Sequence, residues 1–307
     1  MQGLVMRTTG SWYDVLAENQ EIIKCRLRGK TKLQDLKVTN PIAVGDVVTF
    51  EPEPYNPKQG VITAIAPREN YIIRQSVHKK GHGHIIAANI DQAVLMVTLA
   101  MPRTSLGFID RFLVSAEAFR IPTVLVFNKL DLLDEELLNY QQLLKNLYES
   151  LGYPCIFTSV LTKQGIEQFE QMLTGKKTLL SGHSGVGKSS LINAIAPHLN
   201  LKTREVSTFA NKGVHTTTFA TMYQLQTNTF LIDTPGIKEL GLIDMEQWEI
   251  SHYFPEMRKL LNQCRYHNCL HLNEPQCRVL EAVEQGNIAL SRYESYLSML
   301  QNEDSYR

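Results

Sequence analysis

One eight-residue segment restricts the fold of this chain more than any other feature: residues 182–189 read Gly-His-Ser-Gly-Val-Gly-Lys-Ser. The pattern G-x-x-x-x-G-K-S is that of a phosphate-binding loop, which needs a strand before it and a helix after it. The apolar run Thr178-Leu179-Leu180 precedes it, and residues 189–196 fit a helix. We therefore expect an α/β sheet with an anion site at the N-terminus of that helix. A purely structural glycine turn is the alternative.

Each part of this loop has a role in binding phosphate. Its backbone N–H groups turn toward the β- and γ-phosphates, and Lys188 adds a point charge there that would also support catalysis. The Ser189 hydroxyl is a suitable Mg²⁺ ligand. The residues that we expect to contact the nucleotide are Gly182, His183, Ser184, Gly185, Val186, Gly187, Lys188, Ser189 and Ser190.

A guanine-reading motif, Asn128-Lys129-Leu130-Asp131, ends the apolar run of residues 123–127. The Asp131 carboxylate can accept both hydrogens from the N1 and N2 edge of guanine, whereas adenine would leave it unpaired. Asn128 would bond the base near N7, and the stem of Lys129 would pack over the ring. Thr158 and Ser159 follow another strand and fit the loop that completes the base pocket. A plain surface turn is the alternative for the first motif.

The order of these motifs is unusual, because the guanine motif normally follows the phosphate loop and here it precedes it. Asp233-Thr234-Pro235-Gly236 follows the apolar run of residues 230–232, so Asp233 should hold Mg²⁺ through water and the Gly236 N–H should touch the γ-phosphate. Since ligands of such sheets lie at the carboxyl ends of the strands, moving the termini leaves the pocket unchanged. The sequence predicts a circularly permuted, doubly wound GTP-binding domain. The segment after Gly236 then leads directly into the C-terminal part. We expect the difference between bound GTP and bound GDP to be transmitted mechanically to that part.

The remaining sequence suggests two further units, which makes the chain a multi-domain α/β protein. Residues 1–72 contain short β-like runs typical of a small barrel, residues 73–242 alternate strand with helix, and residues 243–307 look helical with short loops. The tract of residues 76–84 contains three histidines, and we interpret it as a basic loop rather than a metal site. No apolar run reaches the ~18 residues of a membrane helix, and the N-terminus lacks a signal-peptide pattern, so we expect a cytoplasmic protein.

A cationic segment in the first unit is a candidate RNA-binding face. The net charge of the chain is zero, with 31 basic and 31 acidic residues, so any contact with nucleic acid must come from a local patch. Alternation along an extended segment places its cations on one face. These cations are Lys24, Arg26, Arg28, Lys30 and Lys32. The alternative is a solvated edge strand whose charges prevent aggregation.

Three of the five cysteines lie within residues 264–277, which argues against a disulfide framework. Together with one histidine they form the pattern C-x₄-C-x-H-x₅-C. The ligands are Cys264, Cys269, His271 and Cys277. Three thiolates and one imidazole suit tetrahedral Zn²⁺ and close its coordination sphere, so we expect one structural zinc ion per chain. His267 competes with His271, but its position between two cysteines favours a turn. Cys25 and Cys155 are interpreted as ordinary thiols.

The motif order N-K-x-D, T-S, G-x-x-x-x-G-K-S, Gly213-Val214-His215-Thr216-Thr217-Thr218 and D-T-P-G resembles the ribosome small-subunit-dependent GTPase A family over nearly the whole chain. The resemblance implies an oligonucleotide-binding-fold N-terminal domain, a permuted GTPase and a zinc-binding domain. It further implies a late small-subunit assembly factor whose GTP hydrolysis is stimulated by the small (30S) ribosomal subunit and which binds rRNA.

The same resemblance bears on the catalytic residues. The family's threonine-rich switch maps onto residues 216–218, and we favour Thr217 over Thr216 as the Mg²⁺ ligand. Ile237 stands where Ras-like proteins carry a water-orienting glutamine, so slow intrinsic hydrolysis is expected. The resemblance implies a role in hydrolysis for His215, which could instead only shape its loop. We expect a monomer that binds GTP and GDP.

Two other functions remain open from the sequence. In one, the chain is an RNA-binding assembly factor with GTP as a static ligand, which turnover measurements with and without small subunits would separate. In the other, it is an ATP-dependent kinase on the same phosphate loop, which Asp131 disfavours.

Overall fold

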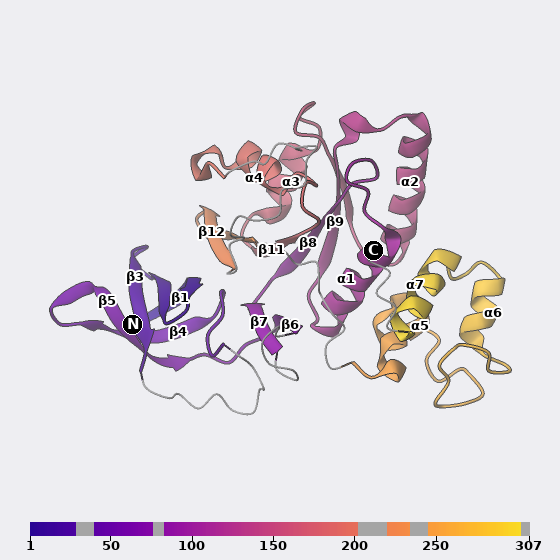
Figure 1. Cartoon of the computed structure of the whole chain (residues 1–307), viewed down its shortest axis with the longest axis horizontal. Coiled ribbons are helices and arrows are strands. Elements are labelled where there is room, and N and C mark those ends of the chain that lie inside the picture. Colours follow the sequence, from indigo (N-terminus) through magenta and orange to yellow (C-terminus); the bar gives the residue numbers. More distant parts are fainter. Residues whose placement is uncertain (29–39, 76–82, 202–219, 234–244, 302–307) are drawn as a thin grey trace, which may run out of the picture.

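The computed structural model of the protein describes residues 1–28, 40–75, 83–201, 220–233 and 245–301. Within these residues a β-barrel, an α/β unit and a helical C-terminal unit follow one another along the chain (Figure 1). The predicted multi-domain α/β class is confirmed. None of the described helices has the length and apolar character needed to cross a membrane.

The barrel is a five-stranded sheet closed on itself. Its strands are β1 (Gln2–Thr9), β2 (Trp12–Ala17), β3 (Ile22–Leu27), β4 (Val47–Glu53) and β5 (Asn56–Ile65). They pair in the order β1-β2-β3-β5-β4, and β4 returns to pair with β1. Period-two alternation buries one side chain in two, as in β3, where Ile23 and Cys25 point inward between exposed neighbours. Phe50 and Ile62, both fully buried, complete the barrel core.

The α/β unit contains six strands. They are β8 (Gln92–Val97), β9 (Thr123–Asn128), β10 (Cys155–Thr158), β11 (Lys177–Ser181), β12 (Thr221–Gln226) and β13 (Thr229–Asp233). The order is β10-β9-β8-β11-β13-β12, and all neighbours are parallel except β12 and β13. The phosphate-loop strand β11 therefore lies at the centre of the sheet, between β8 and β13. This arrangement brings the carboxyl ends of the motif-bearing strands to one edge.

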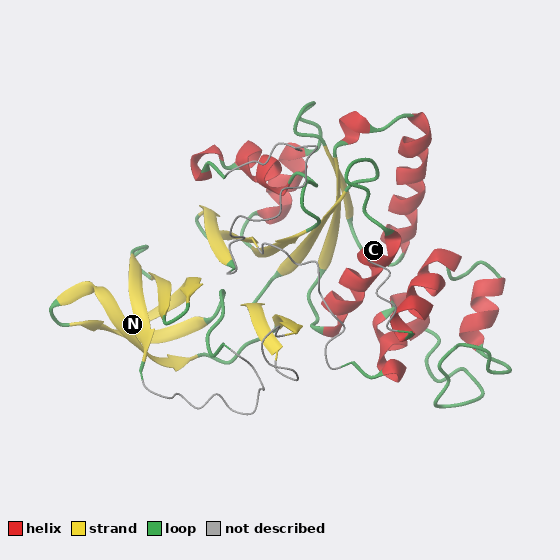
Figure 2. Cartoon of the chain, viewed as in Figure 1, coloured by secondary structure: helices red, strands yellow, loops and turns green. Residues whose placement is uncertain are grey.

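Helices cover both faces of this sheet, as Figure 2 shows by colour. They are α1 (Leu106–Ala118), α2 (Glu135–Ser150), α3 (Ile166–Leu173) and α4 (Lys188–Ile195), with 3₁₀ turns η1 (Leu130–Leu132) and η2 (Pro197–Leu199). In β8, Leu95 packs in the cluster that contains α1 and α2, whereas Val94 and Met96 pack with α3 and α4. All six residues of β8 are buried. Apolar side chains on both faces explain the continuous apolar runs in the sequence.

Two features of the strands were not predicted. Strand β12 lies antiparallel to β1, with Arg7 opposite Thr221, so the barrel and the α/β sheet form one continuous eleven-stranded sheet. A hairpin of β6 (Tyr71–Gln75) and β7 (Gly83–Ala88) connects the two units. His84 lies in β7, which corrects the prediction of a loop at that residue; residues 76–82 lie outside the described chain. The predicted boundary after residue 72 falls within β6.

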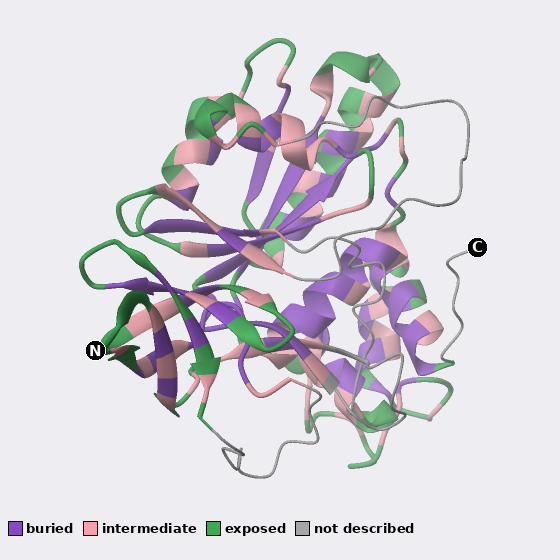
Figure 3. Cartoon of the chain, turned by 60° about the vertical axis from the view of Figure 1, so that its left-hand side comes forward, coloured by how far each residue is buried: buried purple, intermediate pink, exposed green. Residues whose placement is uncertain are grey.

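The C-terminal unit packs against helix α1 of the α/β unit. It contains η3 (Gln247–Tyr253), α5 (Pro255–Arg258), α6 (Arg278–Glu284) and α7 (Leu290–Leu300). Its buried core includes Phe254, Tyr296 and Val114, and Val114 belongs to α1. Figure 3 shows the buried stretches of this unit in purple. The α/β and C-terminal units thus share a core through α1.

Candidate functional site

The phosphate loop connects the end of β11 to the start of α4. Gly182, Gly185 and Gly187 all have positive φ, at 145°, 85° and 100°, which other residues adopt only with strain. At Gly187 a Cβ atom would lie 2.4 Å from Asn128 Nδ2, and at Gly182 it would lie 2.5 Å from Met96 O. Glycine is therefore needed at both positions for two reasons, backbone conformation and close approach.

Lys188 begins α4, and its ammonium group lies inside the loop. Its Nζ donates to the main-chain carbonyls of Gly182, at 2.6 Å, and His183, at 3.0 Å. Burial lowers the pKa of Lys188, and the carboxylate of Asp233 at the end of β13 opposes that shift. The predicted Mg²⁺-side carboxylate thus acts electrostatically on the cation that is predicted to bind phosphate. Ser189 and Ser190 follow in α4 and are half-buried.

Asn128 joins the guanine motif to the phosphate loop. Its side chain is 3% exposed, and its Nδ2 donates to the Val186 carbonyl at 2.8 Å. The Thr158 hydroxyl at the end of β10 donates to Asn128 Oδ1 at 2.9 Å. Both ends of the Asn128 amide are therefore held, and three loops predicted from separate motifs meet at one side chain.

Asp131 is positioned by the neighbouring loop. The buried Ser159 hydroxyl donates to Asp131 Oδ1 at 2.5 Å, while the Asp131 residue itself is exposed. Lys129 has a left-handed backbone, with φ of 65°, and its Nζ donates to the Met101 carbonyl at 2.7 Å. The Ser159 hydroxyl thus holds one oxygen of the Asp131 carboxylate, while the residue stays exposed. A carboxylate that recognises a base must be accessible in this way.

The described residues of the predicted nucleotide site therefore converge on one edge of the sheet, at the ends of β9, β10, β11 and β13. Ser184 and Gly185 are exposed at the tip of the phosphate loop, and Val186 is buried beneath it. Three predicted residues lie outside the described chain: His215, Thr217 and Gly236.

Two contacts in this region were not predicted from the sequence. The rings of Phe108, in α1, and His183 stack at 4.0 Å with 30° between their planes. The loop after β8 supplies the Met101 carbonyl to Lys129. No sequence signal marks Phe108, because it reads as an ordinary apolar position of a helix that lies far from the phosphate loop in sequence.

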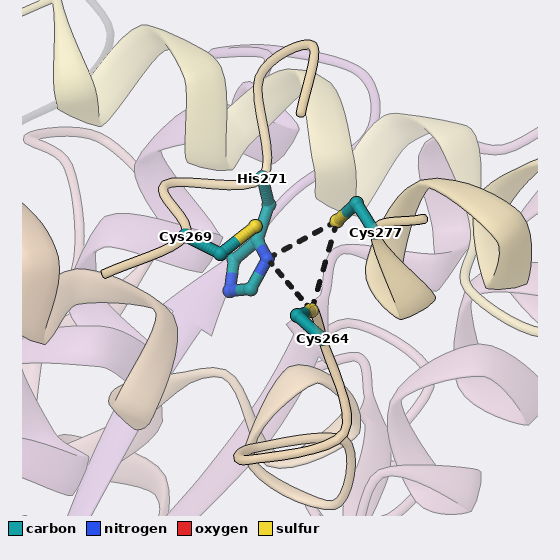
Figure 4. A group of neighbouring side chains, drawn as sticks. All are labelled: Cys264, Cys269, His271 and Cys277. Atoms are coloured by element: carbon teal, nitrogen blue, oxygen red, sulfur yellow. Dashed lines mark hydrogen bonds between the residues drawn. The ribbon is translucent and has the colours of Figure 1, made fainter. Parts of the chain in front are cut away.

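The four predicted metal ligands lie together in the C-terminal unit (Figure 4). All four ligand atoms lie within 4.8 Å of one another. His271 Nδ1 is 3.3 Å from Cys277 Sγ and 3.7 Å from Cys264 Sγ, and the two sulfurs are 3.9 Å apart. A tetrahedral site with metal–sulfur bonds of ~2.3 Å has edges of about 3.5–3.8 Å, so the group fits a bound metal ion. His267, exposed and outside the group, is not brought to it.

The loop that carries the candidate ligands is held by groups that were not predicted from the sequence. The Glu274 carboxylate accepts main-chain hydrogen bonds from Leu270 and Leu272, both at 2.8 Å, on either side of His271. From α7, the Tyr293 hydroxyl donates to the His271 carbonyl at 2.7 Å. The position of Glu274 between two ligands was the available signal, because such outer groups commonly orient metal ligands. Cys25 and Cys155 are buried elsewhere in the fold.

The predicted cationic face of the barrel is only partly described. Lys24, Arg26 and Arg28 are exposed on alternate positions, and Lys30 and Lys32 lie outside the described residues. Strand β3 pairs with β2 on one side and β5 on the other, so the alternative of an edge strand is wrong. Arg26 forms a 3.0 Å ion pair with Glu53, which reduces the positive charge of this face.

Comparison with known proteins agrees with this geometry. A family model described as RsgA GTPase matches residues 65–243, and one described as RsgA N-terminal domain matches residues 2–62. The chain belongs to the RsgA GTPase family. It is therefore a GTP hydrolase, and the kinase alternative is set aside.

Curated relatives of this family match along nearly their whole length. A protein of Cytophaga hutchinsonii named "Small ribosomal subunit biogenesis GTPase RsgA" is 55% identical over 307 residues, which covers 100% of both chains. One of Bacteroides fragilis with the same name is 49% identical and covers 99% of this chain and 97% of its own.

Two solved structures have the same fold. YjeQ from Thermotoga maritima has a TM-score of 0.80 at 39% identity, covering 100% of this chain and 99% of its own. YloQ, described as a circularly permuted GTPase, has a TM-score of 0.74 at 30% identity, covering 98% and 94%. The predicted permuted fold of this RsgA-family chain is confirmed.

Proposed function

We propose that this chain hydrolyses GTP on the small (30S) ribosomal subunit, as a late assembly and maturation factor that binds rRNA and leaves after hydrolysis. One observation carries the proposal. The base-reading and phosphate-binding motifs meet at Asn128 in a chain that matches, over its full length, relatives named small ribosomal subunit biogenesis GTPases. A site in which the base-binding and phosphate-binding loops are joined in this way suits a protein whose binding to a partner depends on whether GTP or GDP is bound.

In the proposed nucleotide site, Asp131, Asn128 and Lys129 recognise guanine, with Thr158 and Ser159 behind them. The phosphate loop of residues 182–190 and Gly236 bind the phosphates. Mg²⁺, which neutralises charge that develops on the phosphates, would be held by Ser189 and Thr217, with Asp233 acting through water. Lys188 supplies a fixed cation at the β- and γ-phosphates. His215 would assist hydrolysis by helping to activate the attacking water.

In the proposed metal site, Cys264, Cys269, His271 and Cys277 hold one structural Zn²⁺ per chain. The donor set supports this choice, because three thiolates and an imidazole leave no open position for catalysis. Burial raises the pKa of the Cys269 thiol to about 12, so a bound cation would be needed to hold it as a thiolate at neutral pH.

The proposed RNA-binding face contains Lys24, Arg26, Arg28, Lys30 and Lys32. We further propose a barrel domain of residues 1–72, a GTPase domain of 73–242 and a zinc-binding domain of 243–307. The protein would act as a monomer in the cytoplasm, where its proposed ribosomal partner is assembled.

Sedimentation with purified small subunits tests this function. The protein should pellet with subunits in the presence of a non-hydrolysable GTP analogue and remain in the supernatant with GDP, and subunits should raise its GTP turnover. Equal pelleting with both nucleotides together with unchanged turnover would contradict the proposal. Large subunits serve as the control.

A further inference from the structure

A buried ion network connects the C-terminal unit to helix α1. Arg292 of α7 is 1% exposed, and it donates to Asp110 of α1 at 2.6 Å and to Glu256 of α5 at 2.7 Å. The Tyr148 hydroxyl of α2 donates to the same Asp110 oxygen at 2.9 Å. The guanidinium also lies 4.5 Å from the centre of the Phe254 ring. Arg292, Asp110, Glu256 and Tyr148 therefore form one buried network that joins four helices of the two units.

Such a network fixes geometry more than it adds stability. Removing two carboxylates and a guanidinium from water is costly, and their attraction offsets this only when the alignment is good. Burial raises the pKa of the Asp110 carboxyl, and the Arg292 guanidinium opposes that shift. A small slide of α7 along α1 would lengthen these bonds and leave a buried charge without its partner. The contact thus favours one docked position of the C-terminal unit on α1.

The opposite side of α1 touches the phosphate loop. Phe108 lies only two residues before Asp110, which is about 3 Å of rise along the helix and roughly 200° around it. Its ring stacks on His183, and the His183 carbonyl accepts the 3.0 Å hydrogen bond from Lys188 Nζ. A displacement of α1 by the C-terminal unit would therefore reach the phosphate-binding lysine through one side chain and one loop residue.

We propose that Arg292 is a positioning residue for the phosphate loop, acting through Asp110 and the first turns of α1. Docking of the C-terminal unit and the choice between GTP and GDP are then coupled in both directions, since such coupling is reciprocal. This inference rests on the proposed nucleotide site but not on the ribosomal partner. This route differs from transmission of the nucleotide state through the segment after Gly236, because α1 lies near the other end of the permuted domain.

The test measures the affinity of the isolated full-length protein for GDP and for a non-hydrolysable GTP analogue. Arg292→Met should change the ratio of the two affinities by at least about five-fold, the lower end of typical coupling. Because this variant leaves two buried carboxylates unpaired, Asp110→Asn/Glu256→Gln/Arg292→Met is measured beside it as a variant without buried charge. Arg258→Met is the matched control, since Arg258 pairs with Glu117 at the far end of α1, with half of its side chain exposed.

Phe108→Leu separates coupling from a merely structural role. In a Phe108→Leu background, the uncharged triple variant should no longer change the affinity ratio, so the two sets of changes should be strongly non-additive. An unchanged ratio in the triple variant, with zinc content and melting temperature close to the parent, would overturn the proposal. So would an equal effect of Arg258→Met, or an effect that persists without Phe108. If the parent itself binds neither nucleotide, the proposed GTP site fails instead.

Discussion

Asn128 Nδ2 lies 2.8 Å from the carbonyl oxygen of Val186, so the residue proposed to contact the base also holds the loop proposed to bind the phosphates. Asn128 ends β9 in the first half of the permuted domain, and Val186 lies in the loop after β11 in the second half. Permutation has reversed their order in the chain while leaving the contact intact. The pocket therefore depends on the order of strands in the sheet and not on their order in the sequence.

Gly187→Ala should break this contact. The added Cβ would meet Asn128 Nδ2 at 2.4 Å on a backbone with φ of 100°. We expect the affinity for GTP to fall at least about ten-fold, equivalent to ~1.4 kcal/mol, in a fluorescent-nucleotide titration. Gly152→Ala is the matched control, because φ there is 94° and nothing lies within 4 Å of its Cβ. It should cost a similar strain but leave nucleotide affinity unchanged; equal losses in both variants would contradict the argument.

Ser159→Ala should weaken guanine recognition. The variant removes the 2.5 Å hydrogen bond to Asp131 Oδ1, so the carboxylate must be oriented at the moment of binding. We expect a loss of about 1 kcal/mol, or roughly five-fold in GTP affinity, with ATP binding unaffected. Competition binding with both nucleotides measures this. Ser150→Ala, at an exposed helix end, serves as the control; a parallel loss for ATP would assign Ser159 to stability instead.

The candidate nucleotide and metal residues could be proposed from the sequence because each proposal follows from local chemistry. Asn128, Lys188 and Cys264 lie in short motifs whose residue types and spacing are set by one ligand. The contacts between the units are not marked by any such motif in the sequence. Arg292 and Asp110 are 182 residues apart, and a buried ion pair reads in sequence as two ordinary surface charges. The pairing of β12 with β1 was missed for the same reason, because strand partners distant in sequence leave no periodic pattern.

His271→Ala should release the metal, whereas His267→Ala should not. His271 Nδ1 lies within 3.7 Å of two ligand sulfurs, while His267 is exposed outside the group. Loss of a direct ligand should lower metal affinity by more than about 100-fold, since even outer groups account for 10–100-fold. Elemental analysis of both purified variants and their melting temperatures measure this. Equal zinc content in the two variants would show that the ligand assignment is wrong.

His215→Ala should abolish turnover stimulated by small subunits and leave GTP affinity nearly intact. The assignment comes from the family motif, and Ile237 leaves no glutamine to orient water. Loss of a group that assists proton transfer typically reduces the rate by about 10²–10⁴-fold. Phosphate release with saturating subunits is the measurement, and His198→Ala, which lies after α4, is the control. Undiminished stimulated turnover would exclude the role.

Arg26→Gln and Glu53→Gln should affect RNA binding in opposite directions. Arg26 is exposed on β3 and pairs with Glu53 at 3.0 Å, so the carboxylate competes with any RNA phosphate for the guanidinium. Removing Arg26 should lower affinity for small subunits and reduce the slope of log affinity against log salt by about 1. Removing the Glu53 charge should free Arg26 and raise affinity at low salt. Binding measured at several salt concentrations separates the two effects. If both variants behave like the parent, this face of the barrel does not contact phosphate, and its alternating cations only keep the strand soluble.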